Sequence, residues 1–160
     1  MIFVTVGAQM PFDRLVRAVD TWAAKSDRTD LFAQTGSALY KPRHFPFSAF
    51  LTPPEFRRRV MGCDVVVAHA GMGSIITALE LGKPILVLPR RGDLNETRND
   101  HQVATAQRFL AQGRVAAAFD EDELLLKLDE IDALRASGRI EKRASTELIV
   151  TLRSFIAGEE

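Results

Sequence analysis

Short apolar runs alternate with longer segments in which apolar residues recur every three or four positions, from one end of this chain of 160 residues to the other. The short runs are typical of strands buried on both faces of a sheet, and the longer segments are typical of helices with one buried face. Strands are expected at residues 2–6, 31–34, 64–68, 85–88 and 115–119, and Phe50 and Leu51 should end one more. Helices are expected at residues 12–22, 53–61, 75–81, 100–112, 121–134 and 139–157.

This alternation predicts an α/β fold in which helices cover both faces of a doubly wound, parallel, Rossmann-like sheet. Residues 1–160 are expected to form a single domain, with helices over residues 121–157 at its end. Ligands of such sheets bind beyond the carboxyl ends of the strands. Since Gly7, Gly36, Gly71 and Pro89 each follow a predicted strand, they should meet at that edge.

The turn His69-Ala70-Gly71-Met72-Gly73-Ser74 joins a buried strand to a helix and carries the clearest sign of chemistry. We expect Ser74 to cap the helix and the amides after it to lack partners, so that the helix start attracts a phosphate or diphosphate. Gly71 and Gly73 would leave room for that ligand. The absence of a following Lys-Ser or Lys-Thr pair excludes a P-loop, and Ile76 stands where the dinucleotide fingerprint of a dehydrogenase needs Gly or Ala. A turn that binds no ligand is the alternative.

Composition narrows the classes of function. The formal net charge is zero, which gives no bulk attraction to nucleic acid or to an anionic membrane. The apolar fraction of 46% is ordinary for a soluble globular protein. The single cysteine, Cys63, adjoins a buried strand and is expected to be an inert core thiol. Together with three scattered histidines it makes no pattern of metal ligands. Residues 1–6 contain no basic leader and are too few to span a bilayer, so we expect a cytoplasmic protein.

Three motifs carry a joint resemblance: His69-Ala70-Gly71-Met72-Gly73-Ser74, Gly82-Lys83-Pro84 and Asn99-Asp100-His101-Gln102. The set resembles the C-terminal, donor-binding domain of family 28 glycosyltransferases, which have the GT-B architecture of two facing Rossmann-like domains. Residues 3–7 with Pro11-Phe12-Asp13 resemble the catalytic subunit of the two-part UDP-GlcNAc transferase of dolichol-linked glycan assembly. They resemble still more the small bacterial exopolysaccharide glycosyltransferase subunits of that type. The resemblance covers most of residues 1 to about 118 and implies a single GT-B-type half, the donor domain.

The resemblance also implies roles for the residues at the expected edge. The diphosphate of a UDP-sugar would be bound by His69, Gly71, Met72, Gly73 and Ser74. Hydroxyls of the sugar would be bound by His101 and Gln102. The cleft would be lined by Gly7, Gln9, Gln34, Thr35, Gly36, Phe50 and Leu51, the last two near the uracil.

One position departs from the family pattern. Many relatives carry a Glu that holds the ribose hydroxyls where this chain has Thr77. Glu80, one helical turn further on, is the candidate to replace it. The recognition of the ribose, and with it the identity of the nucleotide, therefore stays open at the level of the sequence.

Each candidate has a structural alternative. His69 would donate to the β-phosphate and steady the leaving group, or would only bond to the backbone at a strand end. His101 and Gln102 would contact the sugar, or would only begin a helix. The arginines at residues 90–91 would neutralise the diphosphate or carry solvated loop charge. The arginines at residues 57–59 would form a solvated helix face or contact a partner or a membrane.

Taken together, the sequence predicts a glycosyltransferase subunit of polysaccharide or glycan assembly. It would transfer a sugar from a UDP-sugar to a lipid-linked acceptor, with inversion and without a metal or cofactor. His69 is the one catalytic candidate, and no general base is identified. Because the chain supplies one half of a two-domain architecture, a membrane-anchored partner subunit is expected to bind the acceptor and to hold the complex at the inner face of the membrane. The alternative is a non-catalytic subunit that binds the nucleotide-sugar or assembles the complex. Nucleic acid is not an expected partner.

Overall fold

The structure is a computed structural model that describes residues 1–137, and the helix expected at residues 139–157 lies outside them. Six parallel strands form one sheet in the order β3-β2-β1-β4-β5-β6, which confirms the doubly wound α/β fold. The strands are β1 (Ile2–Thr5), β2 (Leu31–Gln34), β3 (Phe47–Ser48), β4 (Val65–His69), β5 (Ile85–Leu88) and β6 (Ala116–Ala117). The helices are α1 (Asp13–Lys25), α2 (Pro53–Gly62), α3 (Met72–Glu80), α4 (His101–Ala111) and α5 (Glu121–Asp129), with short 3-10 turns η1 (Gly92–Leu94) and η2 (Ile131–Ala133).

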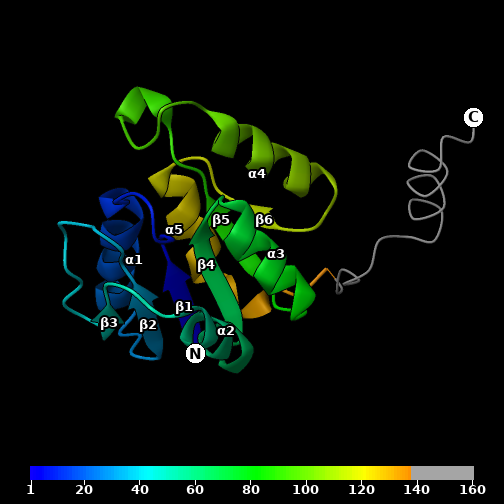
Figure 1. Cartoon of the computed structure of the whole chain (residues 1–160). Coiled ribbons are helices and arrows are strands. Elements are labelled where there is room, and N and C mark those ends of the chain that lie inside the picture. Colours follow the sequence, from blue (N-terminus) through cyan, green and yellow to red (C-terminus); the bar gives the residue numbers. More distant parts are fainter. Residues whose placement is uncertain (138–160) are drawn as a thin grey trace, which may run out of the picture.

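Helices cover both faces of this sheet (Figure 1). The core against α1 and α5 contains Val65 and Val67 of β4, whereas the core against α2, α3 and α4 contains Val66 and Ala68 of the same strand. Both sets of side chains are buried because both faces are covered. That arrangement is the reason why the strands are apolar throughout instead of alternating with polar residues.

The order in which the chain adds strands to the sheet reverses between β1 and β4, although all strands are parallel. Strands β2 and β3 follow β1 toward one side, and β5 and β6 follow β4 toward the other. Thr5 pairs with Ala68 in the register of the two central strands, so the turn at Gly7 and the side chain of His69 leave the sheet next to each other. Doubly wound sheets bind ligands at such a reversal.

The third strand ends earlier than the sequence predicts. β3 is Phe47–Ser48, and the last contact with β2 is the hydrogen bond from the Gly36 amide to the Ala49 carbonyl at 2.7 Å. The expectation that Phe50 and Leu51 end this strand is wrong. The chain leaves the sheet there to begin α2, whose start is fixed at Thr52 by a capping box with Glu55, and Phe50 stays 57% exposed.

The helix predicted at residues 121–134 also ends early, at Asp129. Trp22 donates from its indole nitrogen to the Asp129 carboxylate at 2.8 Å, and the chain then tightens into the 3-10 turn Ile131–Ala133. Ile131 is still buried against the same core. The helical spacing of apolar residues therefore continues past the end of the helix, and periodicity alone overestimates its length.

Candidate functional site

A cavity of about 780 Å³ lies at the carboxyl edge of the sheet, where the chain reverses. It is formed by the turn after β1, the end of β2, α2, the end of β4, the start of α3, the second residue after β5 and the start of α4. Within residues 1–137, none of the side chains that line it is Asp or Glu, and two are Arg. The lining residues are Gly7, Ala8, Gln9, Gln34, Leu51, Pro53, Phe56, Arg57, His69, Ala70, Gly71, Met72, Gly73, Ser74, Thr77, Arg90, His101, Gln102 and Thr105.

The start of α3 forms the centre of this cavity. The helix begins at Met72 with Gly71 as its N-cap, so the prediction that Ser74 caps the helix is wrong by three positions. The shift arises because Gly71 already has the extended backbone of an N-cap. No side chain caps this helix. The amides that an α-helix leaves without intrahelical acceptors are here those of Met72, Gly73 and Ser74, and all three residues line the cavity.

Two glycines enclose the imidazole of His69. A Cβ atom on Gly71 would lie 2.0 Å from His69 Cε1, and one on Gly7, whose φ is +75°, would lie 2.7 Å from His69 Nε2. The space beside Gly71 is therefore taken by His69 and not by a ligand, contrary to the sequence-based interpretation. A Cβ on Gly73 would meet nothing within 4 Å, so room for a ligand exists at that glycine.

Hydrogen bonds fix the position of the ring proton on His69. Arg90 Nη1 lies 3.2 Å and Gln102 Nε2 lies 3.3 Å from His69 Nδ1. The Gln102 amide is oriented by its oxygen, which accepts from the Arg90 backbone amide at 3.1 Å. Since a guanidinium only donates, Nδ1 must accept and the proton of the neutral ring lies on Nε2. Nε2 faces Ser74 Oγ at 3.3 Å, at the start of α3.

His69 is held in its neutral form. Burial and, to a smaller extent, the positive charge of Arg90 lower the pKa of His69 to about 3, although the hydrogen bond to Gln102 opposes both. Near neutral pH the ring thus presents an N–H donor toward the start of α3. Nε2 already carries a proton and has no lone pair with which to accept another, and protonation of Nδ1 would place a positive charge in a buried site.

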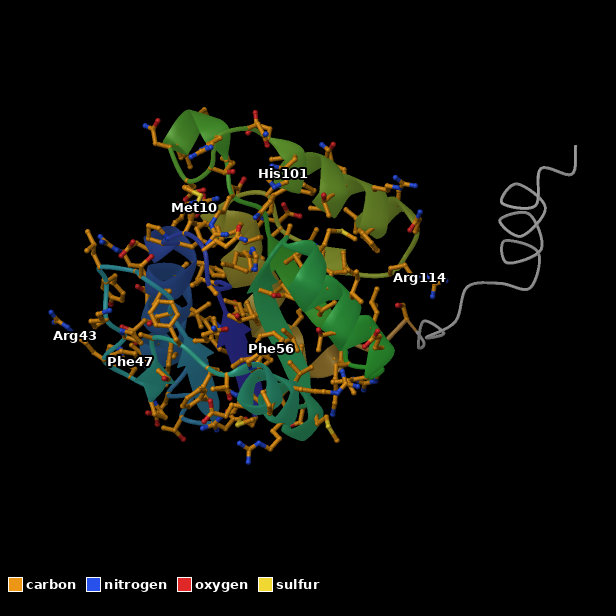
Figure 2. All side chains as sticks on the ribbon, in the orientation of Figure 1. Met10, Arg43, Phe47, Phe56, His101 and Arg114 are labelled. Carbon is orange, nitrogen blue, oxygen red and sulfur yellow. The ribbon has the colours of Figure 1, made fainter. Side chains whose placement is uncertain are left out.

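Arg90 is buried, with only 4% of its surface exposed, so it is not solvated loop charge. Its Nη2 donates to the carbonyls of Val6 at 2.7 Å and Met10 at 2.5 Å, and its guanidinium lies 5.1 Å from the centre of the Phe12 ring. Figure 2 labels Met10 and His101, which both lie in the upper part of the view. Arg91, by contrast, pairs with the exposed Asp93 and does not line the cavity.

The two polar residues that begin α4 differ in their surroundings. Gln102 is 5% exposed, and its amide is engaged with Arg90 and His69, which makes it part of the support of His69. His101 is exposed, lines the cavity and has its ring nitrogen Nδ1 against the Asn99 side chain. Of the two, His101 has the ring that is accessible from the cavity.

The two candidates for ribose contact lie differently. Thr77 lines the cavity, although its hydroxyl donates to the Gly73 carbonyl at 2.8 Å inside α3. Glu80 does not line the cavity, and its carboxylate lies 3.5 Å from Arg57 Nη1. Arg57, from α2, does line it. The expectation that Glu80 faces the ligand is therefore not met, because the helix rotates Glu80 toward α2.

The remaining cleft residues divide in the same way. Gly7, Gln9, Gln34 and Leu51 line the cavity, whereas Thr35, Gly36 and Phe50 do not. Thr35 and Gly36 are buried where β2 pairs with the residues after β3. The sequence interpretation missed Ala8, Pro53, Phe56 and Thr105. Pro53 and Phe56 follow an edge strand, so the rule that placed the other turns at the carboxyl edge would have indicated them.

Other candidates from the sequence have structural roles. Cys63 is buried, and burial raises the pKa of its thiol to about 11. Asp13, in the first turn of α1, accepts a hydrogen bond from the Tyr40 amide. The guanidinium of Arg59 lies 3.6 Å from the centre of the Phe32 ring. Over residues 1–137, no group of three or more His, Cys, Asp or Glu side chains is arranged to hold a metal ion.

Comparison with known proteins shows the family of this chain. Residues 1–150 match the family model described as Glycosyltransferase family 28 C-terminal domain. The chain belongs to glycosyltransferase family 28. Over 125 residues, or 71% of this chain, it is 28% identical to the human protein named UDP-N-acetylglucosamine transferase subunit ALG13. The match spans only 10% of the length of that human relative.

Solved structures that are similar to this chain show the same fold. The NMR solution structure of ALG13 superposes with a TM-score of 0.59 at 21% identity and covers 84% of this chain and 87% of that chain. The glycotransferase of kitacinnamycin superposes with a TM-score of 0.57 at 20% identity and covers 81% of this chain but 34% of that chain. The family 28 domain described here thus has the fold of one GT-B half. None of its helices within residues 1–137 is long and apolar enough to cross a membrane.

Proposed function

We propose that this chain is the donor-binding subunit of a glycosyltransferase that uses a UDP-sugar. The observation that carries the proposal is the cavity at the start of α3, which combines free helix amides, a histidine N–H donor and two arginines with no acidic lining side chain in the described residues. Such a site suits a diphosphate, because amides at a helix start and arginine side chains both stabilise negative charge. The name of the human relative supports a UDP-sugar donor.

The proposed chemistry is an inverting transfer. A hydroxyl of the acceptor attacks the anomeric carbon, the bond from that carbon to the β-phosphate oxygen breaks, and UDP leaves with the electron pair. Negative charge grows on the diphosphate, where the amides of Met72, Gly73 and Ser74 and the Nε2–H of His69 donate hydrogen bonds. Transfer is expected to need no metal, so chelation with EDTA should leave turnover unchanged.

A base must take the proton of the acceptor hydroxyl. His69 already carries a proton on the nitrogen that faces the start of α3, and no carboxylate of residues 1–137 lines the cavity. We therefore assign the base to the acceptor-binding half of the enzyme. Since the human relative is named as a subunit of a UDP-N-acetylglucosamine transferase, we propose that this half is a separate, membrane-anchored partner subunit that presents a lipid-linked acceptor.

The donor is tested by titrating the purified chain with UDP-, GDP- and dTDP-sugars, with and without a co-expressed partner. We expect only UDP-sugars to bind with micromolar affinity, and transfer to the lipid acceptor only with the partner present. Full turnover by the chain alone would contradict the need for a partner. Equal binding of all three nucleotides would contradict the UDP-sugar assignment.

A second candidate is a subunit that binds the nucleotide-sugar without taking part in catalysis. Thr77, in place of the Glu expected in many relatives, favours this candidate, because its hydroxyl is engaged with the Gly73 carbonyl. Ser74→Ala and His69→Ala in the reconstituted pair separate the two. A catalytic subunit should lose turnover by at least about tenfold, or roughly 1.4 kcal/mol in the barrier, whereas a scaffold should keep it.

A further inference from the structure

The buried guanidinium of Arg90 connects the ends of three strands. It donates to Val6 and Met10, in the turn after β1, and it contacts His69 at the end of β4, while Arg90 itself follows β5. Its backbone amide also orients Gln102 at the start of α4. One residue thus determines the position of the turn, the histidine and the glutamine on the floor of the cavity.

The positive charge of Arg90 has no carboxylate partner among residues 1–137. Within residues 1–137 no ion pair involves Arg90 and its Nε atom is buried without a hydrogen-bond acceptor, and burial lowers its pKa. A buried cation without a counter-charge is costly, so stability alone does not explain this residue. An anion bound in the cavity would provide the missing counter-charge.

Among the charged side chains of residues 1–137, Arg90 is the cation that contacts the ring of His69. Arg57 on α2 and His101 on α4 line the same cavity without a hydrogen bond to His69. Glu96, which partly offsets the charge of Arg90, is itself bound by Arg14 at 2.7 Å. On α3, the side chain next to His69 is the hydroxyl of Ser74.

We propose that Arg90 is a positioning residue: its guanidinium holds His69 with Nε2–H directed toward the anion at the start of α3, and supplies buried positive charge behind that anion. The identity of the anion as a diphosphate rests on the proposed function. Lysine cannot replace Arg90 in this role, because a single ammonium cannot span the Val6 and Met10 carbonyls and His69 Nδ1 in one plane.

The experiment combines NMR of the imidazole nitrogens of ¹⁵N-histidine-labelled protein with UDP titration. The resonances of His69 are assigned with His69→Gln. In the wild type we expect the Nε2–H tautomer and no titration of His69 between pH 5 and 8. In Arg90→Met, where burial still keeps the pKa of His69 low, we expect His69 to populate both tautomers and UDP to bind at least about tenfold more weakly. Arg90→Lys, whose ammonium can still donate to Nδ1, should keep the Nε2–H tautomer while still weakening UDP binding. Arg91→Gln, the matched control, should behave as the wild type.

Two outcomes would overturn the proposal. One is an Nδ1–H tautomer in the wild-type protein, which needs no variant and so decides the question even if Arg90→Met fails to fold. The other is an Arg90→Met protein in which His69 populates only the Nε2–H tautomer and UDP affinity is unchanged. If the wild type shows the expected tautomer but binds no UDP, the proposed function fails while the positioning role of Arg90 stands.

Discussion

The two edges of the sheet differ in whether a cation there has a carboxylate partner. At the amino edge the charges of Met1 and Arg28 are paired: the amino group of Met1 lies against Asp64 and 3.3 Å from Asp30, and Arg28 binds both Asp30 and Asp132 at 2.6 Å. At the carboxyl edge the buried cation Arg90 has no carboxylate partner in the described chain. The charges of Met1 and Arg28 are thus neutralised within the protein, whereas the charge of Arg90 can be neutralised by a bound anion.

The helix starts repeat this contrast. Helix α2 begins with a complete capping box of Thr52 and Glu55, and α5 is capped by Asp120. Helix α3, at the reversal point of the sheet, begins at Met72 with no side-chain cap, and α1 and α4 lack one as well. What distinguishes α3 is that the residues of its unpaired amides, Met72, Gly73 and Ser74, all line the cavity, where a ligand can reach them.

The largest effect is expected from the glycine beside His69. In Gly71→Ala the new Cβ would lie 2.0 Å from His69 Cε1, so His69 must move, and we expect turnover of the reconstituted pair to fall about 100-fold.

Gly73→Ala should weaken UDP binding without lowering the free energy of unfolding, since that Cβ meets only open space. Gly62→Ala, also in open space but far from the cavity, is the control for both. Equal effects of the substitutions at Gly71 and Gly62 would contradict the account.

The next largest effect is a dependence of the free energy of unfolding on pH, which arises at the carboxyl edge. His69 has a pKa of about 3 when folded and an ordinary value of 6.5, so below pH 6.5 the unfolded chain binds a proton that the folded chain does not. The free energy of unfolding should therefore fall by up to about 2 kcal/mol from pH 6.5 to 5. Urea denaturation at pH 7 and pH 5 measures this, and His69→Gln should reduce the difference.

The amino edge does not contribute in that pH range. Hydrogen bonds from Arg28 lower the pKa of Asp30 from 3.8 to about 2, so its contribution to stability is present above pH 3.8 and is lost as the pH falls toward 2. A loss of stability between pH 7 and 5 that is the same with and without His69 would show that the carboxyl edge is not the source.

A smaller effect concerns Arg57 and Glu80. Arg57 lines the cavity, so Arg57→Gln should weaken UDP binding about threefold, and less at high salt. Glu80 contacts Arg57 instead of the cavity, so Glu80→Gln should leave UDP affinity within about twofold. Calorimetric titration measures both. A tenfold loss in Glu80→Gln would restore the sequence-based expectation that Glu80 binds the ribose.

The smallest effect is expected at the amino edge itself. Asp30→Asn removes an exposed partner of Arg28 and of the amino group of Met1, and should lower the free energy of unfolding by at most about 1 kcal/mol. The loss should shrink in 1 M salt, and UDP affinity should not change. A change in UDP affinity would mean that the two edges are coupled.

The sequence predicted the sheet well because buried strands and amphipathic helices leave strong periodic signals. β2 and β5 have the predicted bounds. The same signals fail where packing continues past a helix end, as at Ile131, or where an edge strand is only two residues long, as at Phe47–Ser48. The edge of the sheet at which the cavity lies was predicted from the topology alone.

The support of His69 was not predictable in the same way. Nothing local in the sequence distinguishes Arg90 from Arg91, yet one is buried under the cavity and the other is paired at the surface. Likewise, Gly71 appeared to leave room for a ligand, whereas it makes room for His69. Contacts between residues 21 and 84 positions apart, such as those of Arg90 with His69 and Val6, arise only from the tertiary fold.

The central claim is that a nucleotide diphosphate binds to the uncapped start of α3. The most direct measurement is a crystal structure of the chain with UDP. The account predicts that diphosphate oxygens accept hydrogen bonds from the amides of Met72, Gly73 and Ser74, with His69 Nε2 at hydrogen-bonding distance. UDP bound at another edge of the sheet, or a helix start filled by protein side chains in the complex, would contradict it.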